Sequence, residues 1–167
     1  PKRGVGEVAK LIREGAQALV GAILDCEKPV IAKVGGTAAG IGAHIALACD
    51  LVVAGEGVRF IEVFARRGLV PDGGGAYLLP RLVGVQKAKE LLFFGDDVSA
   101  TEAAQLGLVN RVVPHDELLP AARDLAARII RHSPLAIGGI ITAVTRGLNM
   151  GIAEGLQVES EQFARMA

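Results

Sequence analysis

The segment best suited to chemistry is a glycine-rich run between an apolar stretch and a helix-forming stretch. Gly35, Gly36, Gly40 and Gly42 lie between the β-branched residues 30–34 and the helix formers of residues 43–49. Glycines let the backbone approach a ligand closely, and the first N–H groups of a helix have no partner within it. Such a turn suits an anion, although a tight strand-to-helix connection that binds nothing has the same glycines.

The spacing of these glycines excludes the common nucleotide sites. The run Gly35-Gly36-Thr37-Ala38-Ala39-Gly40 lacks the G-x-G-x-x-G pattern, and no lysine followed by a hydroxyl residue comes after Gly42. We therefore expect neither NAD nor ATP. No His, Asp and Glu residues have the spacing of metal ligands, so we also expect no metal.

Two side chains near this run could transfer protons. Asp72 precedes Gly73 and Gly74, where an aspartate often caps a turn, but its carboxylate could also accept a proton from a substrate. His44 lies in the expected helix after the glycines. Its ring either donates to a backbone carbonyl or makes a polar contact with substrate, and the sequence leaves both alternatives open.

An α/β framework is expected to hold these residues. Apolar residues recur at helical spacing over residues 8–24, and a buried strand is expected at 30–34, a helix at 43–49 and a strand at 51–54. Further elements follow the same patterns. They are helices at 84–93 and 101–106, the latter with Ser99 or Thr101 as its cap, a strand at 108–113, and helices at 116–131, 135–147 and 152–165. This order predicts an α/β core with a helical C-terminal extension.

Length and charge limit the class of protein. With 167 residues the chain can form one compact unit, and its 18 basic and 18 acidic residues give no basic field for nucleic acid or anionic lipid. Cys26 and Cys49 lie in apolar surroundings, as reduced core thiols do, which favours a cytoplasmic location. The most apolar stretch, 29–54, contains Lys33, His44 and Asp50, so we expect no membrane span.

Seven ordered segments of the chain resemble the enoyl-CoA hydratase/isomerase, or crotonase, superfamily. They are residues 28–32 (Lys-Pro-Val-Ile-Ala), 36–42 (Gly-Thr-Ala-Ala-Gly-Ile-Gly), 47–50 (Leu-Ala-Cys-Asp), 68–74 (Gly-Leu-Val-Pro-Asp-Gly-Gly), 79–84, 99–103 and 107–110. No single segment is diagnostic. Their shared order over more than half of the chain is what carries the resemblance.

The resemblance implies a fold and an assembly. We expect a crotonase-like ββα spiral core, of which residues 1–114 form a part and lack the N-terminal portion, and a helical C-terminal region at 115–167 that is itself truncated and mediates trimerisation. It also implies a homotrimer or dimer of trimers that acts on acyl-CoA thioesters. Coenzyme A is then part of the substrate, and no separate cofactor is expected.

The resemblance also assigns site residues. In the family two backbone N–H groups hold the thioester carbonyl, and the donor at a helix start corresponds here to Ile41. The other family donor belongs to an upstream segment that residues 1–24 do not match. The expected substrate-binding residues around this site are Gly36, Ala38, Gly40, Gly42, Phe64, Leu69 and Val70.

The residues at the expected catalytic positions argue against the usual hydratase mechanism. Family hydratases use two glutamates to activate water, and those positions hold His44 and Phe64 here. Asp72 occupies a position where several isomerases carry an acidic residue, and one carboxylate can move a proton between two carbons. We therefore expect double-bond isomerisation of an enoyl-CoA through Asp72. The alternatives are hydration or another crotonase reaction that uses His44 with Asp72, and a silent acyl-CoA-binding protein.

Overall fold

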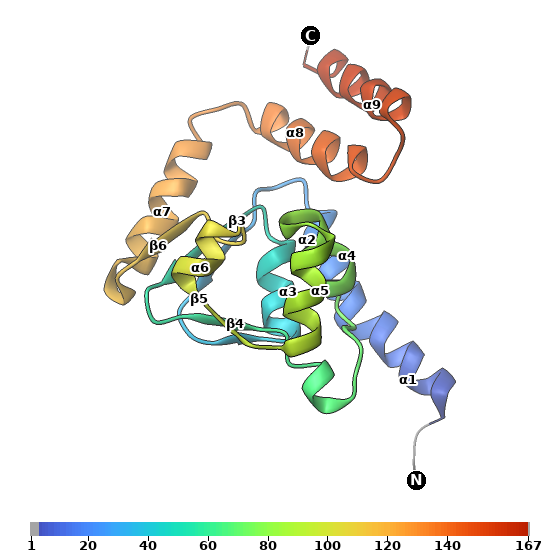
Figure 1. Ribbon diagram of the computed structural model, residues 1–167. Coiled ribbons are helices and arrows are strands. Elements are labelled where there is room, and N and C mark those ends of the chain that lie inside the picture. Colours follow the sequence, from blue (N-terminus) through green and yellow to red (C-terminus); the bar gives the residue numbers. More distant parts are fainter. Residues whose placement is uncertain (1–3, 167) are drawn as a thin grey trace.

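The computed structural model describes residues 4–166, which form helices alternating with short strands (Figure 1). Residues 1–3 and 167, at the ends of the expected regions 1–114 and 115–167, lie outside the described residues. The helices are α1 (Val5–Ile12), α2 (Ala18–Leu24), α3 (Ile41–Ala48), α4 (Gly75–Val83), α5 (Val85–Phe94), α6 (Ala100–Gln105), α7 (Leu118–Ile129), α8 (Pro134–Gly147) and α9 (Ile152–Ala164). Short helical turns are η1 (Arg13–Gln17), η2 (Ala65–Arg67) and η3 (His115–Glu117). The strands are β1 (Ile31–Val34), β2 (Ala38–Ala39), β3 (Leu51–Gly55), β4 (Arg59–Ile61), β5 (Asp97–Ser99) and β6 (Arg111–Val113).

Two three-stranded sheets form the framework of the core. The first is parallel in the order β1-β3-β6, with Ile31 opposite Leu51 and Val53 opposite Arg111. The second has the order β2-β4-β5, in which β2 and β4 are parallel and β4 and β5 are antiparallel. The chain enters the second sheet at β2, immediately before α3, so the glycine-rich turn is anchored to β4.

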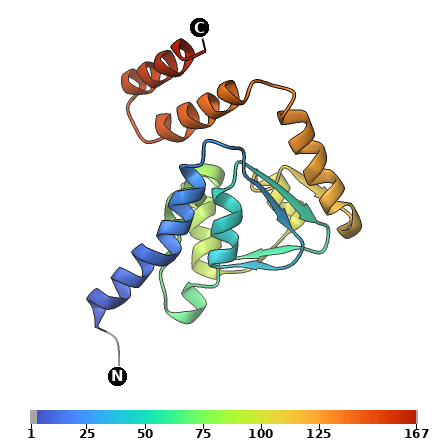
Figure 2. The ribbon, with the colours of Figure 1, turned by 180° about the vertical axis from the view of Figure 1, so that it is seen from behind.

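The hydrophobic core lies between these sheets and the helices α2 to α5, which stand side by side (Figure 2). Its centre is made of small and branched side chains such as Ala43, Val52 and Leu79. A second cluster, Val53 with Leu118 and Leu125, joins the parallel sheet to α7. The α/β class predicted from the sequence is confirmed.

Most of the expected elements occur near the expected positions. The helix expected at 8–24 is continuous from Val5 to Leu24, with the π-helical turn η1 in its middle. The helices expected at 84–93, 101–106 and 135–147 correspond to α5, α6 and α8, and Ser99 caps α6 by accepting a hydrogen bond from the Glu102 N–H at 3.2 Å. The strand expected at 108–113 is shorter than predicted. The paired strand is Arg111–Val113. Just before it, Asn110 donates its N–H to the Val52 carbonyl, and its side-chain oxygen accepts a hydrogen bond from the Val52 N–H, so a side chain takes part in the bonding there.

The C-terminal helices α8 and α9 pack against each other and extend away from the core (Figures 1 and 2). Nine large apolar side chains on or beside them are exposed. They are Leu135, Ile140, Val144, Leu148, Met150, Ile152, Leu156, Phe163 and Met166. Monomeric proteins rarely expose so much contiguous apolar surface, which is the physical basis for expecting subunit contacts here.

Both cysteines are free thiols. Burial raises the pKa of the Cys49 thiol, and the neighbouring Asp50 carboxylate raises it further. The thiol donates to the Ile45 carbonyl at 3.2 Å, as a structural cysteine does. None of the helices between residues 4 and 166 has the length and apolar character needed to cross a membrane.

Candidate active site

The glycine-rich turn places the N-terminus of α3 beside strand β4. Gly40 has φ of 53°, a conformation that favours glycine, and it donates its N–H to the Ile61 carbonyl at 2.9 Å. A Cβ on Gly40 would stand 3.3 Å from Val63 and 3.4 Å from Phe64. Ile41 is the first residue of α3, so its N–H has no partner within the helix and lies at the positive end of the helix dipole. Ile41 is therefore a helix-start donor, and its role as the oxyanion donor stays a prediction.

The other expected residues of this turn do not all face the same way. Ala38 is buried and pairs with Phe60 in the sheet, whereas Gly36 is exposed. Gly42 is partly buried, yet apart from its chain neighbours and the backbone of its own helix no atom of residues 4–166 lies within 4 Å of the position that its Cβ would take. The open side of α3 is therefore the side of Gly42.

We expect Gly42→Val to abolish acyl-CoA binding while the protein stays folded, because the new side chain would enter this open space. Isothermal calorimetry with a saturated acyl-CoA measures the affinity. Gly21→Val is the matched control, since Gly21 is also a partly buried helical glycine with open space at its Cβ position. Unchanged affinity in Gly42→Val would show that this face of α3 does not bind the thioester.

His44 is the most enclosed polar residue of the site. Its side chain is 0% exposed, its Nε2 lies 3.0 Å from Oε2 of Glu62, and its ring stacks on Phe64 with centroids 5.2 Å apart and planes inclined by 8°. The ring therefore contacts a carboxylate, and not the backbone carbonyl that was one alternative for it. His44 and Phe64, the two residues that the resemblance assigns to the glutamate positions of hydratases, are in direct contact.

The turn before α4 closes over the His44 ring. A Cβ on Gly75 would overlap the ring atoms of His44, so the backbone of α4 packs directly against the imidazole. A Cβ on Gly73 would contact the Ile41 side chain and would stand 3.2 Å from Nδ1 of His44. Gly75 is thus required by the bulk of the histidine ring and Gly73 by the Ile41 side chain, while the φ of 85° at Gly74 itself favours glycine.

Asp72 precedes this turn, and its carboxylate is not used to hold it. Asp72 is partly buried, and its Oδ1 is inaccessible to solvent without a hydrogen-bond partner among residues 4–166. The same is true of Nδ1 of His44, and these are the two buried side-chain atoms of the described chain that lack a partner. Since buried polar atoms are nearly always paired, two such atoms, one near Gly73 and one on the residue before it, mark a candidate site.

Leu69 and Val70 are more exposed than the rest of this cluster. They belong to the loop before Asp72 and are 58% and 79% exposed, whereas Phe64 is 8% exposed and packed on His44. The loop is joined to Phe64 by its backbone, because Leu69 donates its N–H to the Phe64 carbonyl at 3.0 Å. A role of Leu69 and Val70 in binding substrate stays a prediction.

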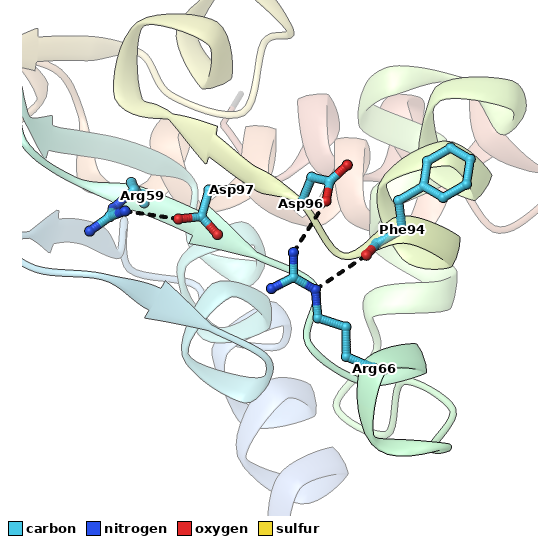
Figure 3. A network of polar contacts seen from close by, with 5 residues as sticks. All are labelled: Arg59, Arg66, Phe94, Asp96 and Asp97. Atoms are coloured by element: carbon cyan, nitrogen blue, oxygen red, sulfur yellow. Dashed lines mark hydrogen bonds and ion pairs between the residues drawn. The ribbon is translucent and has the colours of Figure 1, made fainter.

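Two arginines on the surface hold the segment between β4 and η2 in place (Figure 3). Arg59 donates to Asp97 at 2.9 Å and so joins β4 to β5. Arg66 donates to the Phe94 carbonyl at 3.3 Å and to Asp96 at 3.2 Å, which fixes η2 to the end of α5. Such exposed pairs contribute only about 0–1 kcal/mol to stability, so their consequence is mainly geometric. They fix both ends of the segment that carries residues 62–64.

Glu62 was assigned no role from the sequence, yet it is buried at 7% exposure and bonded to His44. The sequence signal that could have found it is the strand alternation that places Phe60, Glu62 and Phe64 on one side, where all three are buried. A glutamate in phase with two core phenylalanines faces the interior and needs a buried partner.

Comparison with known proteins places this arrangement in a known group. A model of the family described as "Enoyl-CoA hydratase/isomerase" matches residues 2–167. The short-chain-enoyl-CoA hydratase of Clostridium acetobutylicum is 41% identical over 137 residues, which cover 82% of this chain and 52% of that protein. The crotonyl-CoA hydratase of Syntrophomonas wolfei is 39% identical over 137 residues, with 82% of this chain and 53% of that protein covered.

Solved structures agree with the sequence comparison. The enoyl-CoA hydratase/isomerase of Cupriavidus metallidurans superimposes with a TM-score of 0.94 at 34% identity, over 98% of this chain and 61% of that chain. The α/β architecture is therefore the crotonase fold. The chain spans about half the length of the curated relatives it matches.

Proposed function

The chain belongs to the enoyl-CoA hydratase/isomerase family, and from this premise we propose that the protein adds water to, or removes it from, an enoyl-CoA thioester by using His44 with Asp72. The observation that carries the proposal is the pair of buried atoms, Nδ1 of His44 and Oδ1 of Asp72, that have no partner within residues 4–166, with Nδ1 close to Gly73, the residue that follows Asp72. A water bound between them would give both atoms a hydrogen bond.

The proposed reaction uses this water as the nucleophile. As the water oxygen bonds to the β carbon of the enoyl group, Nδ1 of His44 accepts a proton and Asp72 orients the water through its second hydrogen. The electrons of the double bond move to the thioester oxygen, which accepts a hydrogen bond from the Ile41 N–H. The imidazolium then returns its proton to the α carbon, and the product is a 3-hydroxyacyl-CoA.

The oxyanion contact at Ile41 is expected to contribute strongly to the rate. One preorganised N–H donor lowers the barrier by roughly 3–4 kcal/mol in enzymes of this type of chemistry. The second donor that the family resemblance implies would come from the part of the relatives that this chain does not match. The whole site is therefore proposed for the full-length protein.

The relatives support hydration over the isomerisation expected from the sequence. The Clostridium and Syntrophomonas relatives are both named hydratases. The absence of a carboxylate at Phe64, which argued against hydration, loses its force because Asp72 and His44 offer two polar atoms beside one turn. Hydration therefore becomes the first candidate reaction, and isomerisation becomes the second.

Isomerisation stays the second candidate, favoured by the unpaired Oδ1 of Asp72. One carboxylate that takes a proton from the α carbon and returns it to the γ carbon moves a double bond without consuming water. The products separate the candidates. A 2-enoyl-CoA that gains the mass of one water supports hydration, a 3-enoyl-CoA that becomes a 2-enoyl-CoA of equal mass supports isomerisation, and no turnover of either supports a silent acyl-CoA-binding protein.

We further propose that the full-length protein is a homotrimer or a dimer of trimers. The exposed apolar side chains of α8 and α9 support this assembly, since burying a Phe or Leu in an interface would stabilise it by about 1.5–3 kcal/mol. Sedimentation at micromolar concentration should give the trimer mass or twice that mass. Phe163→Glu should shift the distribution towards smaller species, because Phe163 is exposed on α9. A monomer in the wild type would contradict the proposal.

A further inference from the structure

Glu62 is a buried carboxylate whose charge partner within residues 4–166 is a histidine. Its side chain is 8% exposed, and the ion pairs of the described chain connect it to His44 and to no lysine or arginine. A buried carboxylate without a strong partner is costly, so a glutamate in this place needs a reason. The only group it acts on is the imidazole, 3.0 Å from its Oε2.

The imidazole cannot easily turn away from Glu62. Phe64 stacks on the ring, and Gly75 packs so closely against it that even a methyl group there would overlap the ring. His44 is 0% exposed, so no solvent-filled space is available for another rotamer. The side of the ring that carries Nε2 therefore faces Glu62, and Nδ1 faces the turn at Gly73.

The hydrogen bond made by one ring nitrogen determines which nitrogen of a neutral histidine carries the proton. A carboxylate at Nε2 accepts a proton held there, and this leaves Nδ1 with a free electron pair. We propose that Glu62 is a positioning residue that holds His44 in the Nε2–H form and so presents Nδ1 as a proton acceptor beside Asp72. This inference rests on the proposed function, in which Nδ1 accepts the proton of water, and it names the residue that makes this possible.

The first test observes the tautomer directly in the full-length protein. Histidines labelled with 15N give separate signals for protonated and bare ring nitrogens, and the chain of 167 residues has three histidines, so a His44→Gln variant assigns the signals of His44. The wild type should have its proton on Nε2 and a bare Nδ1. A proton on Nδ1 would overturn the proposal, because Glu62 would then be a protonated donor to a bare Nε2.

The second test removes the carboxylate with little change in size. An amide can donate or accept, so Glu62→Gln should give a mixture of tautomers and lower kcat by about 10- to 100-fold, with KM little changed. Glu62→Asp keeps an acceptor and should restore part of the Nε2–H population and of kcat. Glu56→Gln, which changes an exposed carboxylate, should leave the Nε2–H population of His44 and kcat at their wild-type values.

The outcomes separate this inference from the proposed function. Wild-type tautomer and kcat in Glu62→Gln would overturn the positioning role. An Nε2–H tautomer that depends on Glu62, in a wild-type protein that turns over no enoyl-CoA, would support the role of Glu62 and reject hydration as the activity.

Discussion

Asp72→Asn is expected to lower double-bond isomerisation of a 3-enoyl-CoA by about 100-fold or more, the usual scale of a lost acid or base, and to lower hydration of a 2-enoyl-CoA less. The amide has the size of the carboxylate and can still orient a water molecule through its oxygen, but it cannot take up a proton. The buried, unpaired Oδ1 of Asp72 is the atom on which both candidate reactions depend. Initial rates of 2-enoyl-CoA hydration and of 3-enoyl-CoA isomerisation should be measured separately.

The two rates report which role the carboxylate has. A fall in isomerisation of this size with a smaller fall in hydration would mean that Asp72 orients water while His44 accepts the proton. Affinity for a saturated acyl-CoA should stay close to the wild-type value in either case. Asp116→Asn, an exposed aspartate in η3, is the matched control. Wild-type rates in Asp72→Asn would exclude it from the chemistry, and loss of folding would indicate a role in the turn.

Gly75→Ala should destabilise the protein by roughly 2–3 kcal/mol, the scale of overpacking a well-filled core. The added methyl group would overlap the imidazole of His44, which is held by Glu62 and Phe64. Alanine ordinarily stabilises a helix relative to glycine by about 1 kcal/mol, so a loss at the first residue of α4 would be specific to this contact. The midpoint of thermal unfolding measures the effect.

A second substitution identifies the origin of this loss. If the ring causes it, the double variant His44→Ala with Gly75→Ala should be less destabilised than the sum of the single variants. Gly147→Ala is the control at a helical glycine whose Cβ position has no neighbour within 4 Å among residues 4–166. Additive effects in the double variant would show that His44 and Gly75 do not compete for space.

The part of the site that follows the glycine-rich run could be predicted from the sequence. A short β-branched run, glycines and then helix formers gave β1 and α3, and with them the positions of Ile41 and His44. These local signals agree with the tertiary structure because both the strand and the helix are buried and regular. Strands β2 and β5 have two and three residues, too few for an alternating pattern to stand out.

The rest of the site depends on contacts that the sequence does not display. Helix α4 was not predicted, since Pro80 lies inside it and proline normally interrupts a helix. That helix brings Gly75 onto the ring of His44, and the partner of the ring, Glu62, is 18 residues away in the chain. The pairing of a buried histidine with a buried glutamate follows from the meeting of α3 with the end of β4, which no local pattern encodes.

The contact between His44 and Phe64 also constrains how such a site can change during evolution. Placing glutamates at both positions would gather three carboxylates, with that of Glu62, around one buried spot, where like charges repel strongly. Each single substitution would also remove either the partner of Glu62 or the aromatic face against the ring. A two-glutamate arrangement is therefore compatible with this core only when Glu62 is replaced as well.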